Sequence, residues 1–308
     1  MSSGTDLETG LGTRDLPGIY QAASDSSVAG QASYVRWTRA RLVLVVVAAL
    51  AGVLGATVDL SGSKIDIFAL IAIVCFLLAL AAEIILLASR PEEIWYYGRA
   101  VAESAKTLAW RYAMHALPFK GVINQEADKL MLSRMAEAIR DSPIAGELQP
   151  QAGGYVTAGM RSLRHADFPT RKQAYLVGRV DDQISWYTTK ANYNRVHARF
   201  WRVAMLALEV GGAFAALLVL IRVTSVSVDG VLASIIASAG AWLEVRQFEN
   251  LASAYNLTAT ELSLARAEGE AVSAEEGWPD YVGATEDAIS REHTMWLVRR
   301  VKPRLGRV

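Results

Sequence analysis

The chain has 308 residues, of which 52% are hydrophobic and 20% are charged. It is too apolar in places and too charged in others for an ordinary soluble domain, so composition favours a protein with membrane and cytosolic parts. The 31 basic and 31 acidic residues cancel, which removes the electrostatic argument for nucleic-acid binding. The single cysteine, Cys75, excludes an intrachain disulfide and a multi-cysteine metal site. We interpret it as a small buried hydrophobe.

The N-terminal segment is polar. Residues 1–15 carry few large apolar side chains, so we expect a disordered tail. The first apolar run starts only at Leu42 and follows acids as well as bases, which favours a membrane anchor over a secretory signal. From Leu16 onward, with Pro17 in the first turn, the chain is predicted to form a helix that leads into this run.

Four apolar runs predict four membrane spans. Residues about 42–60 and 66–88 are long enough to cross about 30 Å of hydrocarbon and are joined by a short polar turn. A second pair covers residues about 203–223 and 227–245. The last run is short, so a buried or re-entrant segment is the alternative, but starting its helix early gives it a marginal span.

Arginines flank these runs and predict their orientation. Basic residues gather before the first run, after the second, before the third and after the fourth, whereas the two short turns are mainly acidic. Basic residues favour the cytosolic side of a membrane. We therefore expect a multi-pass protein of the plasma or inner membrane with both termini in the cytoplasm, with Arg222 as the exception. The flanking arginines are Arg36, Arg39, Arg41, Arg90, Arg195, Arg199, Arg202 and Arg246.

Helices are predicted between and after the two pairs of spans. Pro91, followed by acids, is the expected opening of one helix, and residues 124–139 have the pattern of an amphipathic helix. Prolines and glycines mark a linker at residues 141–168. A last helix is predicted up to Arg300, followed by a basic tail, residues 301–308, within reach of anionic lipid.

A long helix is predicted from Arg171 to Arg202, because no proline or turn signal interrupts it before the third apolar run. Residues spaced by four lie one above another on a slowly drifting face of a helix. This face is polar and aromatic, and we predict that it docks a partner or a helix of the other half. The alternative is a plain stalk helix whose rings pack against a neighbour. The predicted docking face comprises Arg171, Tyr175, Arg179, Gln183, Tyr187 and Lys190.

The same stretch carries a family resemblance. Followed by a hydrophobic hairpin, its pattern resembles the SLATT domains, small two-transmembrane modules of bacteria. A second cluster around Trp95, Arg99 and Trp110 resembles another subfamily of these domains. The resemblance implies a membrane effector of a conflict system, which responds to nucleotides through a partner nucleotidyltransferase (SMODS) or SLOG domain. The pattern residues are Arg171, Ala174, Tyr175, Arg179, Gln183, Trp186, Tyr187, Lys190, Ala191 and Asn194.

The order of helix, apolar hairpin and cytosolic helix occurs twice, which we interpret as an internal duplication in parallel orientation. The predicted fold is an all-α membrane protein of two tandem units. Each unit has a transmembrane helical hairpin with long cytosolic helices, giving four spans in total. We place the first SLATT-like unit at residues 16–140 and the second at 169–300.

Two further groups of residues lie within the predicted spans. Glu83 and Glu209 lie at matching depths in the two halves, so we predict that they form a carboxylate ring in an assembled pore. The alternative is that each carboxylate extends to the headgroups beside Arg90 or Arg202. Small residues favour close helix packing and a homo-oligomer, although such residues are common in spans. The candidates for helix packing are Gly55, Gly211, Gly212, Ser234 and Ser238.

Catalysis finds little support in the sequence. The four histidines lack metal-ligand spacing, and no nucleophile motif or phosphate loop is present, so we expect neither an enzyme nor a cofactor. Two classes remain. One is a membrane effector that forms a pore or disrupts the lipid bilayer when a nucleotide-sensing partner signals. The other is a non-catalytic anchor or scaffold whose cytosolic helices recruit partners.

Overall fold

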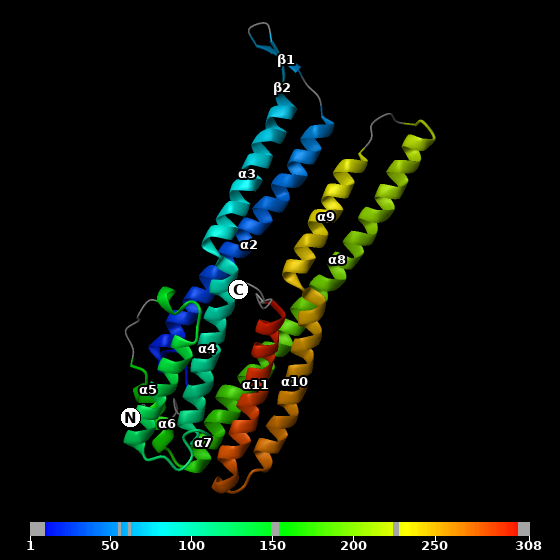
Figure 1. Ribbon diagram of the computed structural model, residues 1–308. Coiled ribbons are helices and arrows are strands. Elements are labelled where there is room, and N and C mark those ends of the chain that lie inside the picture. Colours follow the sequence, from blue (N-terminus) through cyan, green and yellow to red (C-terminus); the bar gives the residue numbers. More distant parts are fainter. Residues whose placement is uncertain (1–9, 55–56, 61–62, 149–153, 224–227, 301–308) are drawn as a thin grey trace, which may run out of the picture. The chain divides into compact units, whose positions relative to one another are not determined.

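The computed structural model describes residues 10–54, 57–60, 63–148, 154–223 and 228–300, which are helical apart from loops and one short hairpin (Figure 1). The predicted all-α class is therefore confirmed in outline. The chain divides into two compact units, and each draws on both halves of the sequence. Gly55 and the basic tail 301–308 lie outside the described residues. Unit 1 comprises residues 1–31, 92–191 and 253–308, and unit 2 comprises residues 32–91 and 192–252.

Unit 2 consists of two helical hairpins, in which α2 lies beside α3 and α8 beside α9 (Figure 1). A two-stranded antiparallel hairpin joins α2 to α3, with Thr57 opposite Asp66. The first turns of α2 and of α8 belong to unit 1, and their later turns to unit 2. The elements are α2 (Gly18–Val53), β1 (Thr57–Leu60), β2 (Ser63–Asp66), α3 (Ile67–Ser89), α8 (Asp182–Leu220) and α9 (Asp229–Arg246).

Local chemistry sets both ends of α3. The Asp66 carboxylate accepts hydrogen bonds from the backbone N–H groups of Phe68 and Ala69, at 2.9 and 3.3 Å, and so caps the first turn. At the other end Arg90 adopts the left-handed conformation, with φ of 41°, and its N–H donates to the Leu86 carbonyl. Pro91 then opens the next helix, as predicted.

Among the described residues, only two of the four predicted spans have helices that are long and apolar enough to cross a membrane, so two such helices stand where four were predicted. The two lie in the helical stretches Ile67–Ala113 and Phe168–Leu220. In α2 the apolar part runs from Leu42 to the helix end at Val53, which is only about 18 Å at 1.5 Å per residue. Helix α9 has 18 residues and carries charges at both ends.

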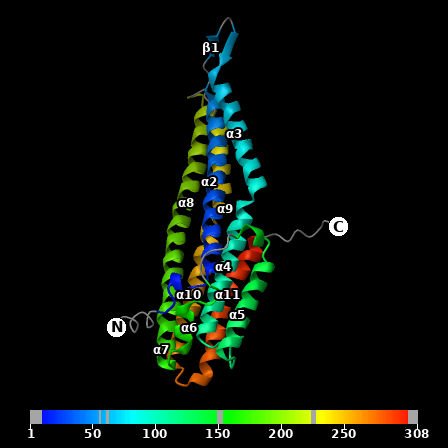
Figure 2. The same ribbon diagram turned by 90° about the vertical axis from the view of Figure 1, so that its left-hand side faces the viewer.

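Unit 1 is a helical bundle (Figure 2). Its helices enclose a continuous hydrophobic core. Large side chains at its centre, including Trp110, Phe119, Tyr175 and Trp278, are fully buried. The predicted helices after Pro91 and over residues 124–139 are both present. Its further elements are η1 (Thr13–Asp15), α4 (Pro91–Ala113), α5 (Asn124–Arg140), η2 (Ala145–Glu147), α6 (Ala158–His165), α7 (Phe168–Tyr175), η3 (Leu176–Asp181), α10 (Phe248–Ala271), η4 (Glu275–Gly277) and α11 (Trp278–Arg300).

Residues 10–15, which were predicted to belong to a disordered tail, have a defined structure, whereas residues 1–9 lie outside the described residues. Leu11 and Leu16 are buried in the core of unit 1, and a short 3-10 helix lies between them. The Thr157 hydroxyl donates a hydrogen bond to the Asp15 carbonyl at 2.6 Å. The two buried leucines contribute about 1.5 to 3 kcal/mol each toward holding this segment in place.

The predicted helix from Arg171 into the third apolar run is confirmed, because α7, η3 and α8 form one unbroken helical stretch, Phe168–Leu220. Its unusual part is η3, a π-helical segment. In a regular α-helix, residues spaced by four drift about 40° per step, so five of them spread over about 160°. The wider π turn accommodates an extra residue and offsets part of this drift. Five side chains from Arg171 to Tyr187 thereby remain buried.

Close backbone contact between α2 and α4 in unit 1 requires a glycine. A Cβ on Gly98 would lie 3.0 Å from the Ala23 carbonyl oxygen and 3.0 Å from the Ser27 nitrogen. The Ser27 hydroxyl also donates to the Trp95 carbonyl at 2.9 Å, which fixes the same approach. Any larger residue must therefore displace α2.

We expect Gly98→Ala to lower the free energy of unfolding by about 1 kcal/mol, because overpacking costs more than the gain in helix propensity. Gly283→Ala in α11 is the matched control, since a Cβ there meets nothing within 4 Å. It should stabilise the chain slightly. Thermal unfolding in detergent, followed by circular dichroism, measures the stability of both variants. Equal changes in stability for Gly98→Ala and Gly283→Ala would contradict the packing described.

Candidate functional site

A buried ion pair lies at the centre of unit 1. Arg179, in the π-helical segment, donates two hydrogen bonds to the Glu286 carboxylate of α11, at 2.9 and 2.8 Å. Both side chains are fully buried. Thr107 of α4 donates to the same carboxylate at 2.8 Å, and Tyr175 donates at 3.1 Å. Four donors from three helical segments therefore converge on one carboxylate. We call these four residues the Glu286 cluster.

Aromatic rings surround this cluster. The Tyr175 ring makes edge contacts with Trp110 and Trp278, at centroid distances of 5.6 and 5.7 Å. The indole N–H groups of both tryptophans, and Nη1 of Arg179, are buried without a hydrogen-bond partner among the described residues. A low-dielectric shell of this kind strengthens the ion pair and also makes an unpaired charge costly.

Burial and the ion pair shift nearby pKa values. Burial, followed by the charge of Glu286, raises the pKa of the Tyr175 hydroxyl well above its usual value. Burial alone would lower the pKa of Arg179, but Glu286 outweighs it and raises that pKa. Burial and the nearby Arg179 charge lower the pKa of Lys106. At neutral pH the arginine is charged and the tyrosine is neutral, so each donates to the carboxylate.

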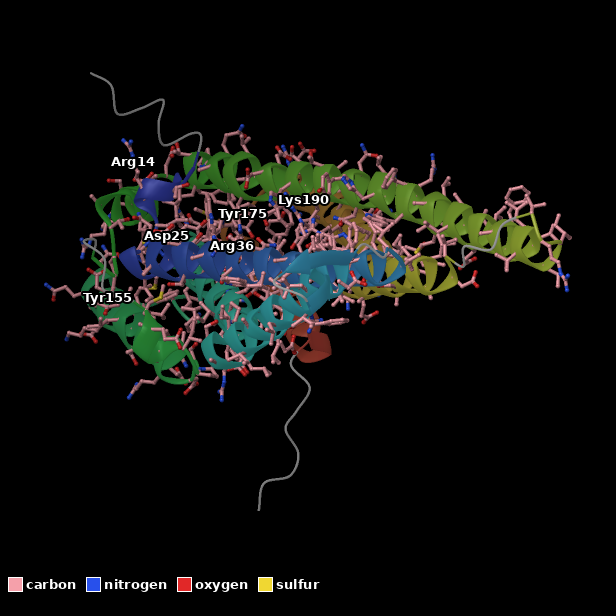
Figure 3. All side chains as sticks on the ribbon, turned by 90° about the horizontal axis from the view of Figure 1, so that it is seen from above. Arg14, Asp25, Arg36, Tyr155, Tyr175 and Lys190 are labelled. Carbon is pink, nitrogen blue, oxygen red and sulfur yellow. The ribbon has the colours of Figure 1, made fainter. Side chains whose placement is uncertain are left out.

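The predicted docking face lies mostly inside unit 1. The first five of its residues, Arg171, Tyr175, Arg179, Gln183 and Tyr187, are buried, whereas Lys190 is exposed. Tyr175 and Lys190 are labelled in Figure 3. Arg171 forms an ion pair with Glu275. Tyr187 packs against the ring of Tyr255, whereas Lys190 lies over Trp186. The chain itself thus covers this face, and a separate partner would reach only its end at Lys190.

Two buried charges were not predicted. Glu286 follows Val282 by four residues and precedes Ile289 by three, so it occupies an apolar-face position of its helix. This position was its only signal in the sequence. Arg164 is 2% exposed and donates to the backbone carbonyls of Tyr112 and Val122. It thereby satisfies the carbonyl at the end of α4, a role that no local motif indicates.

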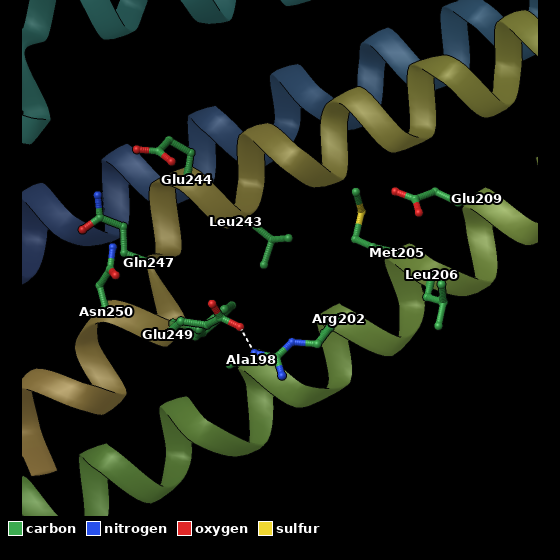
Figure 4. Close-up of a pocket in the computed structure, with 11 residues that line it drawn as sticks. Ala198, Arg202, Met205, Leu206, Glu209, Leu243, Glu244, Gln247, Glu249 and Asn250 are labelled. Carbon is green, nitrogen blue, oxygen red and sulfur yellow. Dashed lines mark hydrogen bonds and ion pairs between the residues drawn. The ribbon is translucent and has the colours of Figure 1, made fainter.

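Unit 2 contains a polar pocket between α8, α9 and the start of α10 (Figure 4), with a volume of about 530 Å³. Glu209 lies on the wall contributed by α8, and Glu244 is contributed by α9. Arg202 forms an ion pair with Glu249 across the pocket. Glu209 makes no ion pair among the described residues, so its carboxylate faces the pocket uncompensated.

Glu83 has a different environment from Glu209. It forms an ion pair with Arg41 of α2, and both side chains are about one-third exposed. The partner is therefore Arg41, where the sequence suggested Arg90. The structure does not bring Glu83 and Glu209 together within the chain, because Glu83 does not line the polar pocket. A ring of carboxylates would require several copies of the protein.

The small residues proposed for helix packing have mixed surroundings. A Cβ on Gly212 would lie 3.9 Å from the Leu232 side chain of α9, whereas a Cβ on Gly211 would meet nothing within 4 Å. The Ser234 hydroxyl is buried without a hydrogen-bond partner in the described part of the chain. Ser238 lines a second, apolar groove. Gly212 thus belongs to the α8–α9 contact, and Gly211 faces outward.

Long helices with exposed apolar surface, together with a helical unit built around a buried ion pair, define a class of α-helical membrane protein with a polar domain. Residues 17–172 match the SMODS and SLOG-associating 2TM effector domain 3, and residues 175–296 match the SMODS and SLOG-associating 2TM effector domain 1. The chain belongs to this SLATT family and carries two of its domains in tandem. No curated protein and no solved structure matches the chain.

Breaking the Glu286 cluster on one side should destabilise the protein. We expect Arg179→Met or Glu286→Leu to lower the free energy of unfolding by about 3 to 5 kcal/mol, because each leaves a buried group unpaired. The loss of unfolding free energy in the double variant should be smaller than the sum of the two single losses. The control pair is Lys120→Met with Asp280→Asn, an exposed bridge at 3.0 Å, which should cost at most about 1 kcal/mol. Additive losses at 179 and 286 would contradict the coupling.

The raised tyrosine pKa values predict loss of stability in alkali. Burial raises the pKa of Tyr281 to about 12, and Tyr175 is raised in the same direction. Above pH 10 an unfolded tyrosine loses its proton while the folded one keeps it, so stability falls by about 1.4 kcal/mol per pH unit and group. Tyr175→Phe should make this fall shallower between pH 10 and 12. Tyr155→Phe, at an exposed position, should leave the fall unchanged. Thermal unfolding measured at several pH values gives the slope of stability against pH for each variant. Equal slopes for the two variants would contradict the role given to Tyr175.

Proposed function

We propose that this protein is an integral membrane effector that responds to a cytosolic, nucleotide-sensing partner by making the membrane permeable. The observation that carries the proposal is the exposed apolar surface of two long helices. In their most apolar stretches only 17% of the residues in α3 and none in α8 are buried. Water cannot solvate such surfaces at low cost, whereas lipid can.

Lengths support insertion of these two helices. Helix α3 has 23 residues and therefore extends about 34 Å, enough for about 30 Å of hydrocarbon. Its charged member, Glu83, is paired with Arg41. The apolar part of α8 begins at Val203 and ends with the helix at Leu220, about 27 Å. A shorter span of this kind tilts less or thins the bilayer locally.

The distribution of charge supports the proposed orientation. In unit 2 the arginines gather near one end of the hairpins, where α2 enters, α8 enters and α9 ends. By the preference of basic residues for the cytosolic side, this end of each hairpin faces the cytoplasm. The shorter helices α2 and α9 return the chain to this side beside α3 and α8, because Leu11, Trp110 and Val282 pack in one core. Both termini therefore lie in the cytoplasm. Unit 1 is then the part that a cytosolic partner meets. The family description, which associates these domains with SMODS and SLOG, supports a nucleotidyltransferase or nucleotide sensor as that partner.

Permeation is proposed to require several copies of the chain. Gly211 presents a face of α8 that nothing in the described structure covers, which suits close approach of a second copy. Glu209 is the better candidate to contact ions, because Glu83 is already neutralised by Arg41. The proposed effector acts without catalysis, through assembly and a conduit for cations.

Ion leakage in cells tests the proposal. Expression together with the activating partner should abolish the membrane potential, measured with a voltage-sensitive dye. Glu209→Gln should weaken cation preference in reconstituted membranes more than Glu83→Gln does, because Glu83 pairs with Arg41 whereas Glu209 has no ion-pair partner among the described residues. A chain that stays in the membrane fraction, binds the partner and causes no leak would instead be a scaffold, and this outcome would refute the effector.

A further inference from the structure

Unit 2 contains a second cavity, an apolar groove between α2, α8 and α9 with a volume of about 610 Å³. It is separate from the polar pocket, and Phe248, at the start of α10, is the one residue that lines both. One end of the groove carries basic and aromatic side chains, and the remainder is lined by aliphatic ones and Ser238. We call it the basic groove.

Two arginines at that end have no carboxylate partner among the residues that the structure describes. Arg39 of α2 and Arg246 of α9 both lie over the ring of Trp242, at 5.2 and 5.7 Å from its centroid. Neither forms an ion pair among the described residues, whereas their neighbours Arg41 and Arg202 each pair with a glutamate. Two guanidinium groups held on one indole form a site that complements an anion with several acceptor oxygens.

The aliphatic wall extends from these arginines in one direction. Helices α2 and α9 run antiparallel (Figure 1), so residues after Arg39 and residues before Arg246 lie on the same side of the basic end. Val46 follows Arg39 by seven residues, and Ile235 precedes Arg246 by eleven. At 1.5 Å per residue the wall therefore extends about 10 to 16 Å beyond the charges. A ligand of this site carries its anionic group at one end and an apolar chain at the other.

We infer that the basic groove binds one anionic phospholipid. Its phosphate contacts Arg39 and Arg246, and an acyl chain lies along the aliphatic wall. Basic pockets between membrane helices on the cytoplasmic side suit such headgroups. This inference rests on the membrane placement in the proposed function, but it requires neither a pore nor a partner. The lipid joins α2, from the first half of the sequence, to α9, from the second.

Native mass spectrometry of the purified full-length chain tests the inference, with phosphatidylglycerol and phosphatidylcholine of the same acyl chains as probes. We expect phosphatidylglycerol to bind at least roughly tenfold more tightly. Arg39→Gln with Arg246→Gln should abolish that preference. The matched control, Arg36→Gln with Arg199→Gln, removes the same charge near the same boundary but outside the groove, and should retain it.

Two further measurements complete the test. One distinguishes a lipid headgroup from a free phosphate compound, and the other shows that the loss of binding is not caused by misfolding. Glycerol 3-phosphate, which has the anionic group without a chain, should not compete. Ala239→Phe should fill the groove and weaken phosphatidylglycerol binding without changing charge, while size-exclusion elution stays that of the parent. Competition by glycerol 3-phosphate, absence of any lipid preference, or equal losses in both charge pairs would each overturn the proposal. Loss of ion leakage in cells would not bear on it.

Discussion

The carboxylate of Glu286 organises unit 1, because it accepts hydrogen bonds from Arg179, Tyr175 and Thr107 in a volume from which water is excluded. An unpaired carboxylate there would cost several kcal/mol, so the helices that carry its donors must stay together. The aromatic rings around it supply burial but little directionality. The ion pair supplies the geometry, and it holds α4, the π-helical segment and α11 in one register. Thr107 lies within the first family domain and Glu286 within the second, so the cluster joins the two.

Much of the helical pattern could be predicted from the sequence, and the reasons are local. Pro91 opens a helix wherever it stands, and the apolar run of α3 is unambiguous. The period of four from Arg171 to Tyr187 correctly indicated one face, but it did not indicate that the face is buried. The burial of this face depends on Glu286, more than a hundred residues away in the sequence, and on a π turn that no residue type indicates. Long-range pairing of this kind has no local signature.

The membrane helices were predicted less well from the sequence. Counting apolar residues gave four membrane helices, but helix ends are set by details that composition does not contain. Helix α2 ends at Val53, before its apolar run is long enough, and α9 carries Asp229, Glu244 and Arg246 within its 18 residues. Likewise the sequence placed Glu83 and Glu209 at matching depths, yet Arg41 neutralises only the first. The two halves of the sequence share the order of their helices, but their glutamates have different partners.

In the proposed arrangement, α3 lies in lipid while the helices of unit 1 lie in the cytoplasm. Maleimide labelling of single-cysteine chains tests this most directly, in a background where Cys75 is replaced by alanine. A cysteine at Leu77, which is 60% exposed on α3, should resist labelling both in intact cells and after lysis, because lipid covers it. A cysteine at Arg134 on α5 should react only after lysis. Labelling of Leu77→Cys in the intact membrane, or of Arg134→Cys from outside the cell, would contradict this arrangement.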